Sequence, residues 1–367
     1  MALTIGLMSG TSLDGVDGVL ADVGGDTLAV RGHAHRAFDP ALRAELLALN
    51  QSGADELHRA ALAANALARV YADATRRLLE QAGCGPGAVA AIGAHGQTVR
   101  HRPHAVDGTG YTIQLLSGAL LAELAGIDVV CDFRSRDVAA GGHGAPLVPA
   151  FHAERFAQPG HDVAVLNLGG IANLTLLPAH GPVRGFDCGP GNGLMDLWCQ
   201  HHLALPYDDG GHRAARGTVD AAWLAMLLSE PYFALAPPKS TGRDLFNAAW
   251  LDARTPAMAP SPDDALATLA ELTARAAVDA IDRYAPATLT LLACGGGAFN
   301  GHLMERLARL QPGRRVASTA ARDVPPDQVE ALAFAWLAAA FVERRPGNLT
   351  EVTGARGARV LGALYPA

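Results

Sequence analysis

The chain has 367 residues, of which 50% are hydrophobic and 18% are charged, and its formal net charge is −7. This length exceeds what one ordinary core needs, so we expect two domains with sizeable cores rather than a disordered chain. The negative charge provides no basic field, which argues against a nucleic-acid or anionic-membrane partner.

The five cysteines are dispersed and none forms a Cys-x-x-Cys pair, which is typical of reduced thiols rather than of a disulfide frame or a zinc site. The N-terminus enters an apolar run without the basic start and cleavage site of a signal peptide. No stretch of ~20 apolar residues lacks charges or turn formers. We therefore expect a cytoplasmic protein without a membrane span.

The first part of the chain alternates apolar runs with polar, glycine-rich breaks. Residues 3–8 and 16–23 are strand-like runs on either side of a Ser-Gly-Thr-Ser break, which is typical of a hairpin. A third strand is expected at 28–35, followed by helices at 40–49 and 56–81. A strand at 88–94, a helix at 117–125 and a strand at 128–131 complete this part.

The second half begins in the same way, with apolar runs at 163–168 and 172–177 on either side of Gly169-Gly170. A strand follows at 183–186, and then helices at 194–202, 219–228 and 265–284. The last expected elements are a strand at 289–293 and a helix at 328–342. This pattern predicts an α/β protein of two related lobes. We place them at 1–135, with the first glycine hairpin, and 136–367, with the second, and the final helix can pack back toward the cleft. The repeat is topological, which alone does not establish duplication.

The first hairpin carries a candidate phosphate site, Ser9-Gly10-Thr11-Ser12-Leu13-Asp14-Gly15-Val16-Asp17. Its two glycines allow backbone N–H groups to approach a phosphate, and its three hydroxyls can donate to phosphate oxygens. Asp14 or Asp17 can hold Mg²⁺, usually through water. The alternative is a plain hairpin in which Ser, Asp and Gly only form the turn. No Gly-Lys-Ser/Thr follows, so this is not a Walker A loop.

Two further glycine turns are candidate nucleotide contacts. Gly169-Gly170 is weak evidence alone, but two such hairpins heading two lobes suggest a nucleotide whose phosphates touch both. Gly295-Gly296-Gly297 follows a strand and could let an adenine lie on the backbone. The alternative for the triple glycine is a strand-to-helix turn with Asn300 as the helix N-cap.

Three charged residues are candidates for chemistry or substrate binding. Asp187 follows a strand on a Gly-Pro-Gly turn that opens a helix, which suits a general base, although it could instead be a helix N-cap. Arg134 lies in a long inter-lobe loop and could pair with a substrate carboxylate, or form an ordinary salt bridge. Glu330 could be only a first-turn acid favoured by the helix dipole.

Together these segments resemble the anhydro-N-acetylmuramic acid kinase family over nearly the whole chain. The matching blocks are Met8–Asp17, His95-Gly-Gln-Thr98, Asp132-Phe-Arg134, Gly144-Ala-Pro-Leu-Val-Pro149, Asn167-Leu-Gly-Gly-Ile-Ala-Asn173, Gly185-Phe-Asp187, Gly189-Pro-Gly-Asn192, Lys239-Ser-Thr-Gly-Arg243 and Gly295-Gly-Gly297.

The resemblance implies two ribonuclease-H-like lobes of the actin/Hsp70/sugar kinase class, with an ATP cleft between them, and usually a homodimer. It implies ATP-dependent phosphorylation of O6 of the 1,6-anhydro sugar while water opens the anhydro ring, giving N-acetylmuramic acid 6-phosphate and ADP in peptidoglycan recycling. Asp187 would activate that water, and Thr98, Arg134 and Glu330 would hold the amino sugar. Residues 9–17 would hold ATP phosphate and Mg²⁺, and residues 295–297 the adenosine.

The sequence departs from the family pattern at three places. His143 stands for a usual Gln, Cys188 for a usual Thr, and Leu116-Ser117 for a common Gly-Asp pair. Two alternatives remain at this point: a kinase for another small sugar or carboxylic acid on the same fold, and a non-enzymatic, ATP-switched binding protein.

Overall fold

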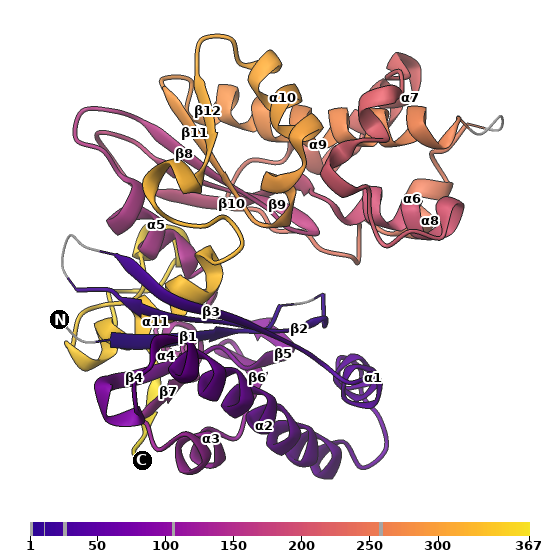
Figure 1. Ribbon diagram of the computed structural model, residues 1–367. Coiled ribbons are helices and arrows are strands. Elements are labelled where there is room, and N and C mark those ends of the chain that lie inside the picture. The colour runs from indigo at the N-terminus through magenta and orange to yellow at the C-terminus, as the bar shows by residue number, and fades with distance from the viewer. Residues whose placement is uncertain (1–2, 11, 25–27, 105–106, 257–259) are drawn as a thin grey trace. The chain divides into compact units, whose positions relative to one another are not determined.

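The chain divides into two compact units (Figure 1). The computed structural model describes residues 3–10, 12–24, 28–104, 107–256 and 260–367. Unit 1 comprises Met1–Phe151 and Gln328–Ala367, and unit 2 comprises His152–Asp327. This division differs from the expected boundary between residues 135 and 136. The physical reason is that the last long helix, α11 (Val329–Val342), packs on strands of the N-terminal sheet.

Unit 1 is built on a six-stranded sheet with the order β13-β7-β4-β1-β2-β3. The first three strands are antiparallel, and β4 and β7 then run parallel to β1. The strands are β1 (Leu3–Met8), β2 (Gly15–Asp22), β3 (Ala29–Ala37), β4 (Val89–Ala94), β7 (Val129–Cys131) and β13 (Ala363–Tyr365).

Helices cover both faces of this sheet. A Cβ on Gly6 of β1 would lie 1.8 Å from the Ala331 carbonyl oxygen of α11, and a Cβ on Gly93 of β4 would lie 2.0 Å from that of Phe334. The helix backbone therefore rests directly on glycines of the two central strands. On the other face, Gly18 of β2 approaches Leu78 of the long helix α2 (Glu56–Ala82).

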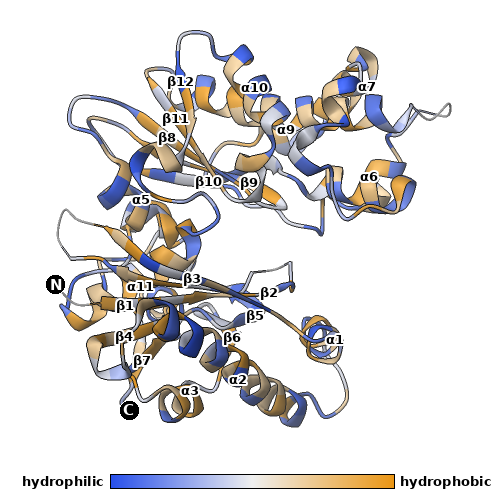
Figure 2. Ribbon diagram, in the orientation of Figure 1, coloured by the Kyte–Doolittle hydropathy of each residue, from blue (hydrophilic) through white to orange (hydrophobic). Residues whose placement is uncertain are grey.

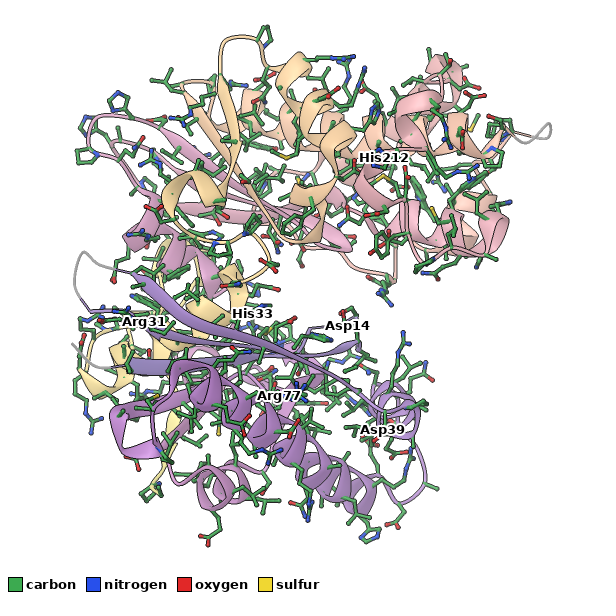
Figure 3. All side chains as sticks on the ribbon, viewed as in Figure 1. Asp14, Arg31, His33, Asp39, Arg77 and His212 are labelled. Atoms are coloured by element: carbon green, nitrogen blue, oxygen red, sulfur yellow. The ribbon has the colours of Figure 1, made fainter. Side chains whose placement is uncertain are left out.

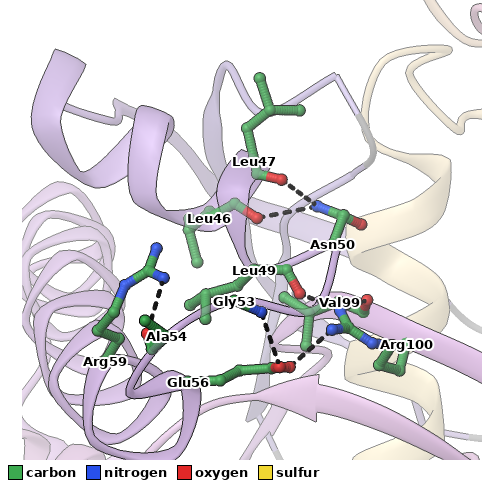
Figure 4. Close-up of polar contacts among 10 residues, drawn as sticks. All are labelled: Leu46, Leu47, Leu49, Asn50, Gly53, Ala54, Glu56, Arg59, Val99 and Arg100. Atoms are coloured by element: carbon green, nitrogen blue, oxygen red, sulfur yellow. Dashed lines mark hydrogen bonds and ion pairs between the residues drawn. The ribbon is translucent and has the colours of Figure 1, made fainter.

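The other helices of unit 1 are α1 (Pro40–Ala48), α3 (Gly118–Ala125), α4 (Ser135–Ala139), α5 (Val148–Phe156, which ends in unit 2) and α12 (Thr350–Thr353). A separate hairpin of β5 (Gln97–Pro103) and β6 (Gly110–Leu115) is inserted after β4. Arg100 of this hairpin donates to Glu56 at 2.6 Å and to the Leu49 carbonyl, which anchors β5 to the α1–α2 loop (Figure 4).

Unit 2 repeats the strand order of unit 1. Its five-stranded sheet, β10-β9-β8-β11-β12, again has three antiparallel strands followed by two strands parallel to the first. The strands are β8 (Val163–Leu168), β9 (Ile171–Leu177), β10 (Arg184–Pro190), β11 (Thr290–Cys294) and β12 (Arg315–Ser318). Two sheets of the same order and direction confirm the predicted pair of ribonuclease-H-like α/β lobes.

The helices of unit 2 are α6 (Gly193–Leu203), α7 (Ala221–Leu228), α8 (Ala248–Asp252), α9 (Pro262–Tyr284) and α10 (Gly301–Leu310). Apolar residues gather on the strands and on the helix faces turned toward them (Figure 2). Each unit has its own buried core, so each sheet is packed by local helices. No helix in the described ranges is long and apolar enough to cross a membrane.

Most predicted strands and helices are confirmed within one to three residues. Helix α2 ends before Gly83, which adopts the left-handed conformation with φ 63°. The β5–β6 hairpin, α5, β12 and β13 were not predicted, because their sequences are short or mix polar with apolar residues. Strand β10 extends to Pro190 rather than ending at Phe186, which changes the setting of Asp187.

Candidate functional site

Both described hydroxyls of the first hairpin, those of Ser9 and Ser12, donate to acceptors within the protein. Ser9 is buried, its Oγ donates to the Gly96 carbonyl at 3.0 Å, and Tyr71 donates to the same Oγ at 2.9 Å. A hydroxyl has only one proton to donate. The prediction that the Ser9 hydroxyl donates to phosphate therefore does not fit this structure, although its backbone remains in the loop.

The rest of the hairpin separates into an open tip and a packed base. Among the described residues outside its own chain neighbours, a Cβ at Gly10 would meet only Ser12 Oγ, at 3.8 Å, whereas one at Gly15 would clash with the Arg36 carbonyl at 2.3 Å. Leu13 and Val16 are buried core residues. Thr11 lies outside the described residues. Room for a ligand is therefore found at Gly10 and Ser12, and Gly15 is required by packing.

The two aspartates of this hairpin differ in their surroundings. Asp14 is exposed (Figure 3) and accepts a 2.6 Å hydrogen bond from Ser12. Asp17 on β2 accepts a hydrogen bond from His35 of β3 at 2.8 Å. His33 lies 3.8 Å from the same Asp17 oxygen. Burial alone would raise the pKa of Asp17, but its hydrogen bonds with these histidines outweigh burial and lower it.

Both aspartates are chemically suited to Mg²⁺, which prefers carboxylate oxygens and keeps several waters. Asp14 presents an exposed carboxylate, whereas the carboxylate of Asp17 is half-buried and hydrogen-bonded to His35. No group of three or more potential metal-binding side chains occurs among the described residues. The fit is therefore to an ion held by one or two carboxylates together with water or phosphate.

Arg134 is the best-positioned cation of unit 1. Its Nε and Nη2 donate to Nε2 of His95 at 3.2 and 3.0 Å, and its Nη1 donates to the Gly144 carbonyl at 2.9 Å. No carboxylate of the described chain forms a salt bridge with it, so the salt-bridge alternative is not supported. Burial lowers the pKa of Arg134 to about 10, and the charges of Glu330 and Asp137 oppose this, so the group stays charged at neutral pH.

The other two predicted sugar-binding residues also belong to unit 1. Glu330 is exposed on the first turn of α11 and interacts electrostatically with Arg134. Thr98 lies on β5, and its hydroxyl accepts a hydrogen bond from Gln114 at 3.2 Å. Its proton thus remains available for another acceptor, since a hydroxyl can accept and donate at once.

In unit 2, three glycine turns converge on Asn192. The amides of Asn192 and Gly191 donate to the Gly169 and Gly170 carbonyls at 2.7 and 3.0 Å, and a Cβ on Gly297 would lie 2.7 Å from Asn192 Oδ1. The structure therefore brings together Gly169-Gly170, Gly189-Pro-Gly-Asn192 and the triple-glycine segment.

At some of these glycines a side chain would clash with neighbouring atoms, and at others the space is open. A Cβ at Gly295 would lie 2.4 Å from Asn167 Oδ1, and one at Gly297 would also clash, whereas one at Gly296 would have its nearest neighbour at 3.8 Å. A Cβ at Gly170 would meet no described atom within 4 Å. Asn300 caps α10 by accepting from the Leu303 amide, which confirms its expected N-cap role and leaves the adenosine contact of the triple glycine a prediction.

Asp187 lies within strand β10 rather than on the turn, which corrects the predicted placement. The β9–β10 register shifts between Asp187 and Gly189, so Cys188 is the extra residue of a β-bulge. A bulge bends a strand and re-aims the neighbouring side chain, and bulges are frequent next to active sites. The N-cap of α6 is Asn192, so the N-cap alternative for Asp187 is wrong.

The Asp187 carboxylate has one protein donor. The Thr241 amide donates to Oδ2 at 3.0 Å, and Oδ1 accepts no hydrogen bond from the described residues. Burial raises the pKa of Asp187 to about 6, which the Thr241 hydrogen bond only partly offsets. The backbone is fixed on both sides, because the Asp187 amide donates to the Lys239 carbonyl at 3.3 Å and Tyr232 donates to the Asp187 carbonyl at 2.7 Å.

The three departures from the family pattern make contacts of their own in the structure. Cys188 is buried, and its thiol donates to the Ala172 carbonyl at 3.3 Å. His143 is exposed and its ring packs edge-on against His104. Ser117 precedes α3 and its amide donates to the Ala64 carbonyl at 3.4 Å.

Sequence reasoning missed three residues that fix the candidate site. His95 holds Arg134, the Gln97 side chain donates to the Gly10 carbonyl at 3.1 Å, and Thr241 holds Asp187. All three fall in blocks that carry the family resemblance. The contacts themselves could not have been found, because they join residues that are 39 to 87 positions apart in sequence.

Comparison with known proteins gives a consistent answer over the whole chain. Residues 2–367 match the family described as anhydro-N-acetylmuramic acid kinase. The protein of that name from Variovorax paradoxus (strain S110) is 60% identical over 100% of this chain and 99% of its own length. The one from Bordetella petrii is 62% identical over 100% and 96%. A weaker similarity, with a TM-score of 0.49 and 12% identity over 93% and 96% of the two chains, is to a solved activator of 2-hydroxyisocaproyl-CoA dehydratase from Clostridium difficile.

Proposed function

The chain belongs to the anhydro-N-acetylmuramic acid kinase family, and on this basis we propose how its residues perform the reaction. As a member, it is a kinase that uses ATP to phosphorylate anhydro-N-acetylmuramic acid in peptidoglycan recycling. The finer proposal is that phosphorylation occurs at O6 and that water opens the anhydro ring in the same reaction. The products are then N-acetylmuramic acid 6-phosphate and ADP.

The observation that carries this proposal is the setting of Asp187. One carboxylate oxygen is held by the Thr241 amide, and the other is open to a water molecule. A pKa of about 6 leaves the carboxylate ionised at neutral pH and close to the value at which a general base works best. Asp187 therefore accepts the proton of the attacking water.

The reaction balances with Asp187 as the only protein base. The water oxygen bonds to the anomeric carbon, and the bond from that carbon to O6 breaks with its electron pair going to O6. O6 then bonds to the γ-phosphorus as the bond from that phosphorus to the ADP oxygen breaks. Capture of O6 by the phosphoryl group replaces the general acid that glycoside hydrolysis ordinarily needs.

For substrate binding we propose that Arg134 pairs with the lactyl carboxylate, and that Thr98 and Glu330 contact the sugar. The support is that Arg134 is charged and meets no protein carboxylate at salt-bridge distance in the described chain. A carboxylate partner from the substrate would fill that role, because a charge-assisted pair is among the stronger polar contacts.

For nucleotide binding we propose Ser9–Asp17 and Gly169-Gly170 at the phosphates and Gly295-Gly296-Gly297 at the adenosine. The open positions Gly10, Gly170 and Gly296 support close approach of a ligand to the backbone. Mg²⁺ would be held by Asp14 and Asp17, partly through water, and would offset charge on the phosphates.

We also propose that the chain works in the cytoplasm as a homodimer. Cys84, Cys131, Cys188 and Cys199 are free thiols, and Cys294 Sγ contacts Asn167, which suits a reducing compartment. The dimer rests on the family resemblance alone, and light scattering at several protein concentrations tests it.

The direct test of the proposed substrate is sugar-dependent release of ADP. We expect rapid ADP release with anhydro-N-acetylmuramic acid and much slower release with anhydro-N-acetylglucosamine, which lacks the lactyl carboxylate. Equal rates with the two sugars would contradict recognition of the carboxylate, and ADP release independent of either sugar would contradict the proposed acceptor.

A further inference from the structure

His95 joins two segments of unit 1 that are far apart in the sequence. It lies between β4 and β5 and is only 5% exposed. One ring nitrogen, Nδ1, lies 3.2 Å from the Ser9 carbonyl oxygen in the first hairpin. The other, Nε2, lies 3.2 and 3.0 Å from Nε and Nη2 of Arg134. Both site segments therefore meet on one imidazole.

The contacts fix the protonation state of this ring. Arginine has only donors, so Nε2 must accept, and the ring proton is on Nδ1, where it donates to Ser9. Burial and the charge of Arg134 lower the pKa of His95 to about 3, so the ring is neutral at any physiological pH. The ring also contacts Phe334 of α11 in a tilted arrangement with the ring centres 4.8 Å apart, which adds a packing contact to the two polar ones.

Because the acceptor that holds Arg134 is a neutral imidazole, the guanidinium keeps its charge available for a substrate carboxylate. A carboxylate at this position would form a salt bridge with the guanidinium, whereas the imidazole holds the guanidinium without taking the place of a carboxylate partner. A guanidinium has five N–H donors. His95 engages one on Nε and one on Nη2, and Gly144 engages one on Nη1, so one donor remains on each terminal nitrogen. Two donors side by side match the two oxygens of a carboxylate.

We propose that His95 is a positioning residue that aims Arg134 at the substrate carboxylate and ties it to the first hairpin. This inference rests on the proposed role of Arg134 in sugar binding. It assigns His95 no proton transfer. The two ring nitrogens have separate tasks: Nε2 serves selection of the carboxylate-bearing sugar, and Nδ1 serves the geometry of the Ser9–Gly10 backbone.

Two substitutions separate these tasks. An Asn side chain can keep the donor near Nδ1 but has no atom at Nε2, and a Gln side chain can keep an acceptor near Nε2 but lacks the Nδ1 donor. We expect His95→Asn to raise KM for anhydro-N-acetylmuramic acid about tenfold, the size of one lost charge-assisted hydrogen bond, with KM for ATP little changed. We expect His95→Gln to do the reverse.

A double-mutant cycle with Arg134→Met tests whether His95 affects sugar binding through Arg134. Arg134→Met alone should weaken the muramic sugar by about 10- to 150-fold, the value of a bidentate charge-assisted pair. If His95 acts through Arg134, the preference for the muramic sugar over anhydro-N-acetylglucosamine should fall no further in the double variant than in Arg134→Met. The buried His152 of unit 2, changed to Asn, is the matched control: stability can fall, but the sugar preference should stay.

The outcomes distinguish failure of this inference from failure of the proposed function. Normal sugar preference in Arg134→Met removes Arg134 from carboxylate recognition, and with it the basis of the proposal. A loss in Arg134→Met together with unchanged preference in folded His95→Asn contradicts only the role of His95. Additive losses in the double variant, or equal losses of both substrates in His95→Asn and His95→Gln, show a merely structural histidine.

Discussion

Asp187 is the residue on which the proposed chemistry depends, and its protonation follows from its local environment. The carboxylate is half-buried, has one amide donor, and has no cation close enough for a salt bridge among the described residues. The charged form is therefore poorly stabilised, which is why the pKa is raised rather than lowered. A structural carboxylate in the same protein, Asp137, instead receives bonds from Gly144, Asn348 and Thr353.

We expect Asp187→Asn to lower kcat by at least ~10²–10⁴-fold, the usual contribution of a general base. The substitution should not lower stability at pH 8. The folded-state pKa of about 6 lies above the usual 3.8, so this carboxylate favours folding at low pH and loses that contribution as pH rises through 6. Steady-state kinetics tests the expected loss of kcat, and thermal unfolding at pH 8 tests the expected stability. A variant with reduced stability and activity within a few-fold of the parent would mean that Asp187 is structural.

The pH profile of the parent enzyme gives a second prediction at this residue. Because a base works only when deprotonated, kcat/KM for the sugar, which reports the free enzyme, should fall about tenfold per pH unit below about 6 and reach a plateau above it. His95 should not contribute to this profile, since its pKa is about 3. A rate that stays constant from pH 7 to pH 5 would contradict the assignment of the base.

The sequence identified Asp187 but placed it on a turn, and this error shows where residue-level reasoning ends. The Gly-Pro-Gly that follows predicts a break, yet β9 supplies pairing partners as far as Pro190. Whether a strand continues through a Gly-Pro-Gly segment depends on the strand that pairs with it, and the local sequence does not show which strand that is. The contacts of His95 and Thr241 were unpredictable for the same reason.

In the glycine turns of unit 2, some glycines are required by packing and others leave space for a ligand, so mutations can test the two roles separately. Gly170 leaves open space where a side chain would be, whereas a Cβ at Gly191 would lie 2.2 Å from the Gly169 carbonyl oxygen. The two residues belong to the same pair of turns, which makes them a matched pair for mutation.

We expect Gly170→Val to keep the fold and to raise Kd for ATP by tenfold or more, because a side chain would occupy the space that phosphate is proposed to approach. Gly191→Ala should instead destabilise the protein, since the clash involves backbone on both sides. Calorimetric titration with Mg-ATP and thermal unfolding of both variants measure the difference. Normal ATP affinity in Gly170→Val would move the phosphate site away from this turn.

At the scale of the whole molecule, the order of strands was predicted better than the division of the chain. Strand, glycine turn and strand at the start of each half indicated two similar lobes, and both sheets have that order. The expected boundary counted α11 with the second lobe, while allowing it to pack back, because the helix is apolar nearly all round, with eleven buried residues, and its sequence does not specify a partner. Gly6 and Gly93 accept its backbone, and a glycine in a strand only hints at such an approach.

The packing of α11 predicts the outcome of a truncation after Asp327. We expect the shortened chain to lose the structure of unit 1, because the central strands β1 and β4 lose the helix that covers one face. Unit 2 is one continuous segment with its own core and should remain folded. Limited proteolysis with mass spectrometry should give a resistant fragment close to 152–327. A resistant fragment from residues 1–151 would show that α11 is dispensable.

The central claim is that one reaction phosphorylates the sugar and adds water to it, and isotope labelling tests this most directly. The enzyme is incubated with ATP and anhydro-N-acetylmuramic acid in ¹⁸O-labelled water, and the product mass is measured at once, before the free sugar exchanges oxygen with the solvent. We predict N-acetylmuramic acid 6-phosphate with one labelled oxygen at the anomeric carbon and one ADP released for each molecule. A phosphorylated sugar that retains the anhydro ring, or an opened product without the label, would contradict the proposed reaction.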